Sequence, residues 1–219
     1  MSVKDVLLPL LSYSNATTTE GIEKCAFIGA YLKVRVTAAA IESDALPAPG
    51  PFARAFELDA REPSSSHENL MSTQNAEQVL QRFGSAARGC DLAFDLSLIR
   101  ATAEDAEALL VHLARVKDLT LLPIKAHNGQ QEALAKSLIF KSGRPVLIFD
   151  ERLSGELSDS FDHVSIAWDH SAQAARAVAD ALPFLKLART IRILTMSEDN
   201  KLASSSGDGL AKHLAIHGI

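Results

Sequence analysis

The sequence predicts an α/β protein: an open parallel five-stranded sheet with helices on both faces, followed by a partial second copy of the same arrangement. Two observations support this fold class. Short unbroken apolar runs alternate with longer segments whose apolar residues recur at helical spacing, as in a parallel sheet covered on both faces. In addition, a strand, a turn, a helix and a strand recur late in the chain at matched lengths, which indicates a duplicated unit.

The first strand, helix and strand lie at the start of the chain. Val6–Leu11 is an apolar run of strand length, and the Ser, Asn and Thr residues that follow it can cap a helix. Apolar residues then recur at helical spacing from Ile22 to Leu32. Val34–Ile41 is the next apolar run, so it is predicted as the second strand.

A region of mixed character separates the second strand from the third. Proline and glycine in ALPAPGPF (residues 45–52) break regular structure. EPSSSHEN (residues 62–69) has the composition of an exposed loop. The pattern predicts a helix over Gln74–Arg88, and the run from Cys90 to Ile99 is predicted as the third strand.

Two more helices and two more strands complete the first copy. Thr102–Lys117 begins with a capping residue and acidic residues and ends with basic ones, which match the signs of the helix dipole. Leu119–Ile124 is predicted as the fourth strand, Gln130–Phe140 as a helix and Pro145–Phe149 as the fifth strand. A complete α/β domain is therefore expected over residues 1–152.

An incomplete second domain is expected over residues 160–219. Leu8–Leu11 aligns with Ile166–Asp169 at an offset of 158 residues, and the same offset carries Val36 to Leu194. The second copy is therefore predicted to repeat the first strand, helix and strand.

The rest of the second copy has a simple pattern. Ser171 is the expected helix cap, and Pro183 is expected to bend or interrupt the helix that follows. A polar loop is predicted over residues 197–209, before a short helical piece. Counterparts of the third, fourth and fifth strands do not follow, so we expect a tandem protein whose second domain is truncated at Ile219.

Composition excludes several classes of protein. A net charge of −5 and a pI of about 5.8 provide no general attraction to nucleic acid or to anionic lipid. No run approaches the ~20 apolar residues of a membrane span, and no signal peptide is evident. The two cysteines, Cys25 and Cys90, are far apart in sequence and are expected to pack in the core. These features predict a cytoplasmic protein.

Three segments carry a family resemblance. VLLPLLSYS before a helix, KSGRPVLIF, and above all VSIAWDHSAQAARAVADALPFL resemble the universal stress protein family in its tandem-domain form. The resemblance covers most of the chain outside residues 47–81. It implies an adenine nucleotide alpha hydrolase-like fold, a cytoplasmic location, dimer formation and a role in the stress response. Some members of the family bind ATP and others do not.

The resemblance also implies where ATP would bind. ATP-binding members have an acidic residue after the first strand, in a pattern like P-V-D-G-S, and a segment G-x2-G-x9-G-[ST] after the fourth strand, where backbone N–H groups approach phosphate closely. In the first copy the acidic position is Leu11, and only Gly129 and Gly143 follow the fourth strand, at a spacing that does not fit. We therefore expect the first domain not to bind ATP.

The second copy keeps half of this pattern. Asp169 and Ser171 match it, and His170 replaces the glycine. Two interpretations remain open: Asp169 is a turn residue at the end of a strand, or it is an adenosine contact of a nucleotide site.

Other candidate chemistry is weaker. Gly207 and Gly209 form a G-x-G before a helix, but Lys212 stands where the third glycine of a dinucleotide fingerprint would be, so a flexible loop is expected. His213 and His217 lie one helical turn apart without a third ligand, so no metal site is expected. Neither G-x-S-x-G nor C-x-x-C occurs, so no catalytic residue is expected.

Two functional hypotheses follow. The leading one is a universal stress protein-like module that acts through protein association, as a homodimer or with another protein, and whose first domain lacks the ATP motif. The alternative is a regulator that binds ATP or another adenine nucleotide in its second domain.

Overall fold

A computed structural model of the chain describes residues 3–12, 16–43, 64–152, 161–195 and 200–219. The chain divides into two compact units. The first unit is Lys4–Leu153, and the second is Ser154–Ile219 together with Met1–Val3.

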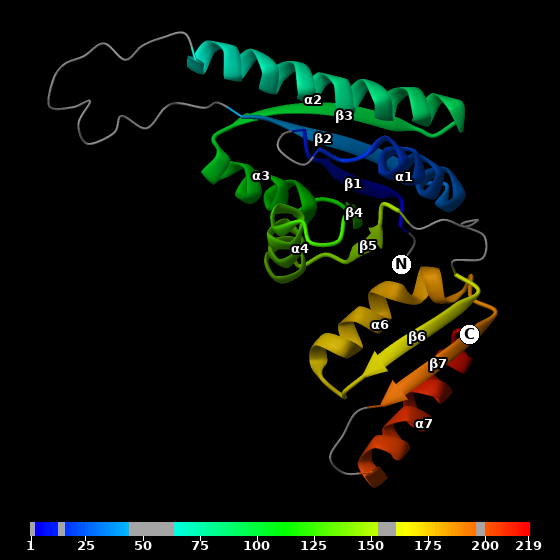
Figure 1. The fold of residues 1–219 in the computed structure, drawn as a ribbon. Coiled ribbons are helices and arrows are strands. Elements are labelled where there is room, and N and C mark those ends of the chain that lie inside the picture. Colours follow the sequence, from blue (N-terminus) through cyan, green and yellow to red (C-terminus); the bar gives the residue numbers. More distant parts are fainter. Residues whose placement is uncertain (1–2, 13–15, 44–63, 153–160, 196–199) are drawn as a thin grey trace, which may run out of the picture. The chain divides into compact units, whose positions relative to one another are not determined.

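The first unit is built on a five-stranded parallel sheet with the strand order β3-β2-β1-β4-β5 (Figure 1). This arrangement confirms the predicted fold class. The order reverses between β1 and β4, and we call the carboxyl ends of these two strands the switch point, because open α/β sheets bind ligands at this position. The strands are β1 (Asp5–Leu10), β2 (Arg35–Ser43), β3 (Phe94–Ala101), β4 (Leu119–Ile124) and β5 (Val146–Asp150).

Helices cover both faces of this sheet. On one face, α1 packs closely on β2: a Cβ built on Gly29 would lie 2.8 Å from Val36 Cγ2. On the other face, the buried residues Leu7 and Ala39 form a cluster with side chains of α3 and α4. The helices are α1 (Thr19–Leu32), α2 (Ser64–Gly89), α3 (Ala103–Arg115) and α4 (Gly129–Lys141).

The starts of α1 and α3 are capped as the sequence predicts. Thr18 Oγ1 accepts a hydrogen bond from the Gly21 N–H at 3.0 Å, and Thr102 Oγ1 accepts one from the Asp105 N–H at 3.2 Å. Each cap satisfies a backbone donor that has no partner within its helix.

The structure corrects the prediction around α2. The helix begins at Ser64, so residues 64–69 are helical and not a loop; no helix breaker follows them, and the apolar face of α2 buries Phe83 in the core. The third strand begins at Phe94, because a turn around Asp91 (φ 54°) separates it from α2. Cys25 packs in the core as expected, but Cys90 is only partly buried. Residues 45–52 lie outside the described residues.

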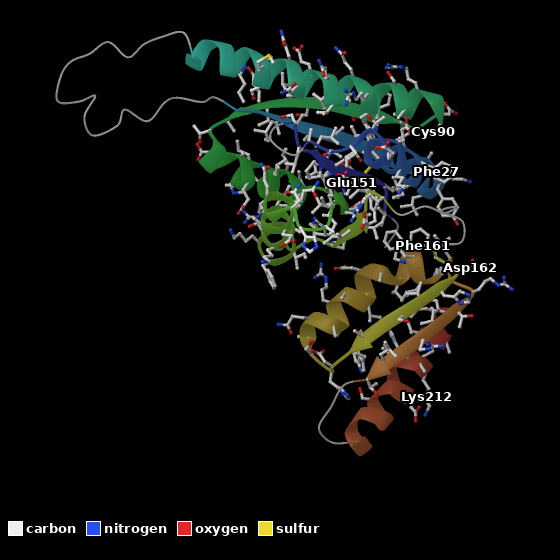
Figure 2. All side chains as sticks on the ribbon, viewed as in Figure 1. Phe27, Cys90, Glu151, Phe161, Asp162 and Lys212 are labelled. Carbon is white, nitrogen blue, oxygen red and sulfur yellow. The ribbon has the colours of Figure 1, made fainter. Side chains whose placement is uncertain are left out.

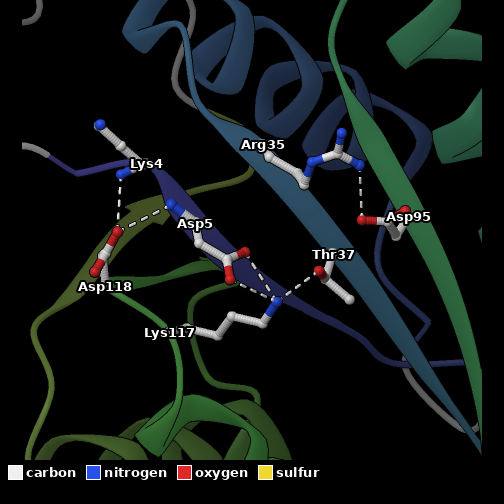
Figure 3. Close-up of polar contacts among 7 residues, drawn as sticks. All are labelled: Lys4, Asp5, Arg35, Thr37, Asp95, Lys117 and Asp118. Carbon is white, nitrogen blue, oxygen red and sulfur yellow. Dashed lines mark hydrogen bonds and ion pairs between the residues drawn. The ribbon is translucent and has the colours of Figure 1, made fainter.

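Charged residues join the amino ends of the strands, opposite the switch point (Figure 3). Lys117 Nζ lies 2.8 Å from Asp5 Oδ1 and 2.8 Å from Thr37 Oγ1. One Asp118 carboxylate oxygen accepts hydrogen bonds from the backbone N–H groups of Lys4 and Asp5. These contacts tie the segment before β4 to both β1 and β2.

Over residues 161–195 and 200–219, the second unit has two parallel strands and two helices. Its buried apolar core is formed by Ile166, Val178, Leu185, Leu210 and Leu214. No helix in the described part of either unit is long and apolar enough to cross a membrane. The elements of this unit are β6 (His163–Trp168), α6 (Ala172–Leu185), β7 (Thr190–Thr195) and α7 (Asn200–Ile216).

Strand pairing corrects the predicted offset of the second copy. Val6 pairs with Val36, and Val164, which lies 158 residues after Val6, pairs with Ile191. The counterpart of Val36 is therefore Ile191, at an offset of 155, and the prediction of Leu194 is wrong. The connection from β6 to the cap of α6 (residues 169–170) is five residues shorter than that from β1 to the cap of α1 (residues 11–17). The connection from α6 to β7 (residues 186–189) is two residues longer than that from α1 to β2 (residues 33–34), so the offset falls by three.

The helices of the second unit also differ in part from expectation. Ser171 caps α6 as predicted, but Pro183 does not interrupt this helix, which continues to Leu185. The predicted loop is wrong from Asn200 onward, because α7 begins there and contains both Gly207 and Gly209. A Cβ on Gly207 would lie 3.0 Å from Thr195 Cγ2, so this glycine allows α7 to approach β7 closely.

Candidate functional site

The switch point of the first unit has an apolar residue after β1. Leu11 follows β1 directly, its N–H donates to Thr17 Oγ1 at 3.1 Å, and its carbonyl accepts from the Thr17 N–H at 2.9 Å. The Leu11 side chain has no hydrogen-bonding group, so it cannot accept a hydrogen bond from adenosine. Residues 13–15 lie outside the described residues.

The start of α4, on the other side of the switch point, is capped by its own chain. Residues 125–128 connect β4 to α4, and the buried Asn128 is the cap. Its Oδ1 accepts hydrogen bonds from the N–H groups of Gln130 and Gln131, each at 3.2 Å. These first-turn donors, which bind phosphate in many α/β proteins, are therefore engaged by a neutral side chain.

A buried carboxylate lies beside this cap. Glu151, directly after β5, is only 1% exposed and packs inside the first unit (Figure 2). Its Oε2 accepts from the Thr18 N–H at 3.2 Å, and its Oε1 accepts from Gln131 Nε2 at 3.1 Å. Gln131 Oε1 in turn accepts from the Lys125 N–H at 2.6 Å. This chain of hydrogen bonds joins the start of α1 to the start of α4 and the end of β4.

The first turns of α1 fit closely around Glu151. A Cβ on Gly21 would lie 2.9 Å from Glu151 Cγ, so glycine leaves space for the carboxylate. Lys24 Nζ donates to the Glu151 backbone carbonyl at 2.8 Å. Burial, and to a smaller extent the charge of Glu151, raises the pKa of the Cys25 thiol well above its usual range. Cys25 is therefore a buried, neutral thiol at neutral pH.

The two glycines near the predicted phosphate segment have separate places. Gly129 is the first residue of α4. Gly143 has φ 69° in the turn between α4 and β5, which lies at the amino end of the sheet. Gly143 therefore allows a turn with left-handed backbone conformation, at the end of the sheet opposite the switch point.

In the second unit the structure brings Asp169 and Ser171 together. Asp169 Oδ1 accepts from the Ser171 N–H at 2.9 Å, and Ser171 Oγ accepts from the Ala174 N–H at 3.0 Å. Hydrogen bonds from the Ser171 hydroxyl and then from its backbone N–H lower the pKa of Asp169. The carboxylate is exposed and ionised at neutral pH, so it serves the turn and is also accessible to a ligand.

The backbone conformation of His170, between these two residues, shows why the family pattern has glycine at this position. Its φ is 67°, in the left-handed region that glycine adopts at little cost. Its ring centroid lies 6.1 Å from that of Trp168, and its Nε2 is buried without a hydrogen-bond partner in the described residues. Trp168 Nε1 donates to Ser206 Oγ at 2.8 Å, which joins the end of β6 to α7.

The remaining candidate residues are histidines that do not belong to the turns after β1 or β6. The ring centroids of His213, in α7, and His217, directly after α7, lie 4.8 Å apart, and both residues are exposed. Within the described ranges, no group of three or more His, Cys, Asp or Glu residues is placed to hold a metal ion. His112 and His163 are exposed.

Sequence reasoning missed Asn128, Gln131 and Glu151. Asn128 had a usable signal, because Asn directly before a helical pattern is a common cap. Glu151 and Gln131 had none: they are 20 residues apart, and Glu151 is 133 residues from Thr18, so only the sheet order brings them together.

Comparison with solved structures supports the fold. No family model matches the chain, and no curated protein matches it. Among solved structures, a universal stress protein from Archaeoglobus fulgidus DSM 4304 aligns with 97% of this chain and 73% of its own, with a TM-score of 0.67 and 13% identity. A universal stress protein family member from Burkholderia pseudomallei aligns with 65% of this chain and 94% of its own, with a TM-score of 0.47 and 14% identity. The chain has the fold of universal stress proteins.

Proposed function

We propose that the chain is a universal stress protein-like module of the stress response that works in the cytoplasm through association with a second copy or another protein, and that its first unit takes no nucleotide. The observation that carries the proposal is the hydrogen-bonded closure of the switch point. Asn128 occupies two first-turn donors of α4, the N–H groups of Gln130 and Gln131. Glu151 accepts from the N–H of Thr18, the cap of α1. Leu11 stands at the acidic position, so neither half of the family's nucleotide pattern is found among the described residues.

The two outer strands of the first sheet differ in a way that favours association at β5. In the described part of the chain, β3 and β5 each pair with a strand on one side only. β3 carries Asp95 and Arg100, which are exposed charges of the kind that protects a sheet edge from pairing. β5 is apolar from Val146 to Phe149, and all its residues are half-buried. Phe140, near the end of the preceding helix, is 82% exposed.

Sedimentation velocity over a range of chain concentrations tests the association. We expect wild type to form a dimer whose fraction rises with concentration. Phe140→Glu should weaken it, because a charge replaces an exposed apolar group beside β5. Met71→Glu, at an exposed apolar position of α2 on the opposite face of the sheet, is the matched control and should leave it unchanged. A wild-type chain that remains monomeric throughout would contradict association with a second copy.

A specific observation also supports a second candidate function, a regulator that binds ATP or another adenine nucleotide in the second unit. Asp169 is an exposed, ionised carboxylate at the end of β6, one residue from the cap of α6. This corresponds to the acidic position of the family pattern.

Trp168 provides a local test of this alternative. It is the chain's single tryptophan and precedes Asp169, so its fluorescence reports on the second unit. If the alternative holds, Mg-ATP changes this fluorescence saturably, Asp169→Ala abolishes the change, and Asp208→Ala, at an exposed acid of α7, preserves it. Our leading proposal expects no saturable change in wild type.

A further inference from the structure

We propose that Glu151 is an internal anion of the first unit: its carboxylate occupies the donors at the switch point that an anionic ligand would need, and it thereby keeps such ligands out. The inference deepens the proposed function and rests on its claim that this unit takes no nucleotide. It assigns the exclusion to one specificity-determining residue.

The contacts of Glu151 are those of a bound anion. Each carboxylate oxygen accepts a hydrogen bond from a different element, Oε2 from the Thr18 N–H before α1 and Oε1 from Gln131 Nε2 on α4. The amino end of a helix favours negative charge, and α1 has fourteen residues, long enough for this effect. The carboxylate therefore has both the hydrogen bonds and the field that stabilise an anion.

The donor on α4 is held in advance. Gln131 is buried, its Oε1 accepts from the Lys125 N–H, and its own N–H donates to Asn128 Oδ1. Its Nε2 is thereby directed toward Glu151. A buried side chain whose amide oxygen and backbone are both held donates with less loss of conformational freedom, as in preorganised binding sites.

The space around Glu151 is fitted to it as well. A Cβ on Gly21 of α1 would lie 2.9 Å from Glu151 Cγ and 3.1 Å from Cδ. Lys24 holds the Glu151 backbone through its carbonyl. The residue is 1% exposed, so its neighbours enclose the carboxylate, and a negative charge there repels a second anion.

Chemical rescue by formate tests the proposal in the full chain. Glu151→Ala removes the carboxylate but leaves its donors, so formate, a free carboxylate of the same size, should take its place. Urea unfolding is followed at pH 7 in sodium formate and in sodium chloride of equal concentration. We expect Glu151→Ala to unfold at lower urea than wild type in chloride, and formate to restore at least about half of the lost midpoint.

Two controls define a specific result. Wild type should gain nothing from formate relative to chloride, because its donors are occupied. Glu20→Ala removes an exposed acid from the first turn of the same helix and should also gain nothing. Equal gains in all three chains, or no gain in Glu151→Ala, would overturn the proposal.

A double-mutant cycle provides a second test. Gly21→Ala should lower the unfolding midpoint of wild type and lower it less in the Glu151→Ala background, where the close contact is gone. If Glu151→Ala does not fold, Glu151→Asp, which keeps the charge on a shorter side chain, serves in the same cycle. Additive effects would contradict the fitted site.

The outcomes separate this inference from the proposed function. Binding of Mg-ATP to the first unit of wild type would refute the proposed function, whatever formate does. Failure of formate rescue without ATP binding would refute only the role of Glu151.

Discussion

Lys117 Nζ lies 2.8 Å from Asp5 Oδ1 and 3.0 Å from Asp5 Oδ2, so one ammonium group bridges both oxygens of a carboxylate on β1. The Lys117 side chain is only 15% exposed, whereas the side chains of the neighbouring pair Arg35 and Asp95 are more than half exposed. Figure 3 shows both pairs at the amino end of the sheet. The two pairs therefore allow a partly buried ion pair to be compared with a solvent-exposed one at the same end of the sheet.

Lys117→Met should lower the free energy of unfolding by about 1–2 kcal/mol, because it removes a charge-assisted hydrogen bond from a partly buried group. Arg35→Met should cost only about 0–1 kcal/mol, since exposed ion pairs are screened by water and salt. Urea unfolding of both variants at pH 7 measures the difference. Equal losses would show that burial of Lys117 contributes nothing.

Asp118 makes part of the stability depend on pH. Backbone N–H groups of Lys4 and then of Asp5 lower the pKa of this carboxyl group. A lowered pKa in the folded state stabilises the protein above the pKa of the unfolded chain, about 3.9 for aspartate, and this contribution is lost as pH falls through the lower folded value.

Asp118→Asn should therefore reduce stability at pH 7 by about 1 kcal/mol, and its deficit relative to wild type should shrink below about pH 4, where wild type also loses the ionised carboxylate. Urea unfolding at a series of pH values checks this. A deficit that stays constant down to the acid limit would contradict the assigned role.

Gly29 should be intolerant of a side chain. Gly29→Ala places a methyl group 2.8 Å from Val36 Cγ2 and 3.1 Å from Leu92, so overpacking of about 1–3 kcal/mol should exceed the helix-propensity gain of about 1 kcal/mol. Thermal unfolding of the variant should show a lower midpoint.

Gly84→Ala is the matched control within α2. A Cβ on Gly84 would lie 3.4 Å from its nearest neighbour, Phe94 Cε2, which is an ordinary contact. The variant should therefore gain about 0.5–1 kcal/mol of stability from helix propensity. Opposite signs for the two variants are expected. Equal signs would show that the close packing of α1 on β2 is not as described.

Gly209 tests the corrected start of α7. Gly209 lies within α7, and a Cβ added there would have no neighbour within 4 Å. Gly209→Ala should therefore stabilise the second unit by about 0.5–1 kcal/mol. In the flexible loop predicted from the sequence, no such gain is expected. Unfolding followed by Trp168 fluorescence reports on this unit. A neutral or destabilising result would favour the loop.

The fold could be predicted from the sequence because buried parallel strands require unbroken apolar runs, and these are easily recognised in VLLPL and VLIF. The start of α2 could not, since serine-rich segments occur both in loops and in the first turn of helices. The 155-residue offset between Val36 and Ile191 could not be predicted either, because an apolar pattern does not reveal how long a turn is.

The residues of the candidate sites also fall into those that the sequence reveals and those that it does not. Leu11, Asp169 and Ser171 could be placed at strand ends and a helix start from the sequence, because each follows a strand or precedes a helix within a short segment. Glu151 was missed because its partners, Thr18 and Gln131, come from two other crossovers of the sheet. Contacts of this kind depend on strand order, which a single sequence does not display.

Isothermal titration of the Asp169→Ala chain with Mg-ATP tests the central claim most directly, because this variant removes the candidate contact of the second unit and leaves the first intact. The account predicts no saturable heat at a dissociation constant below about 100 μM, roughly −5.5 kcal/mol. Saturable binding in this range would place a working nucleotide site in the first unit and contradict the closure of its switch point by Asn128 and Glu151.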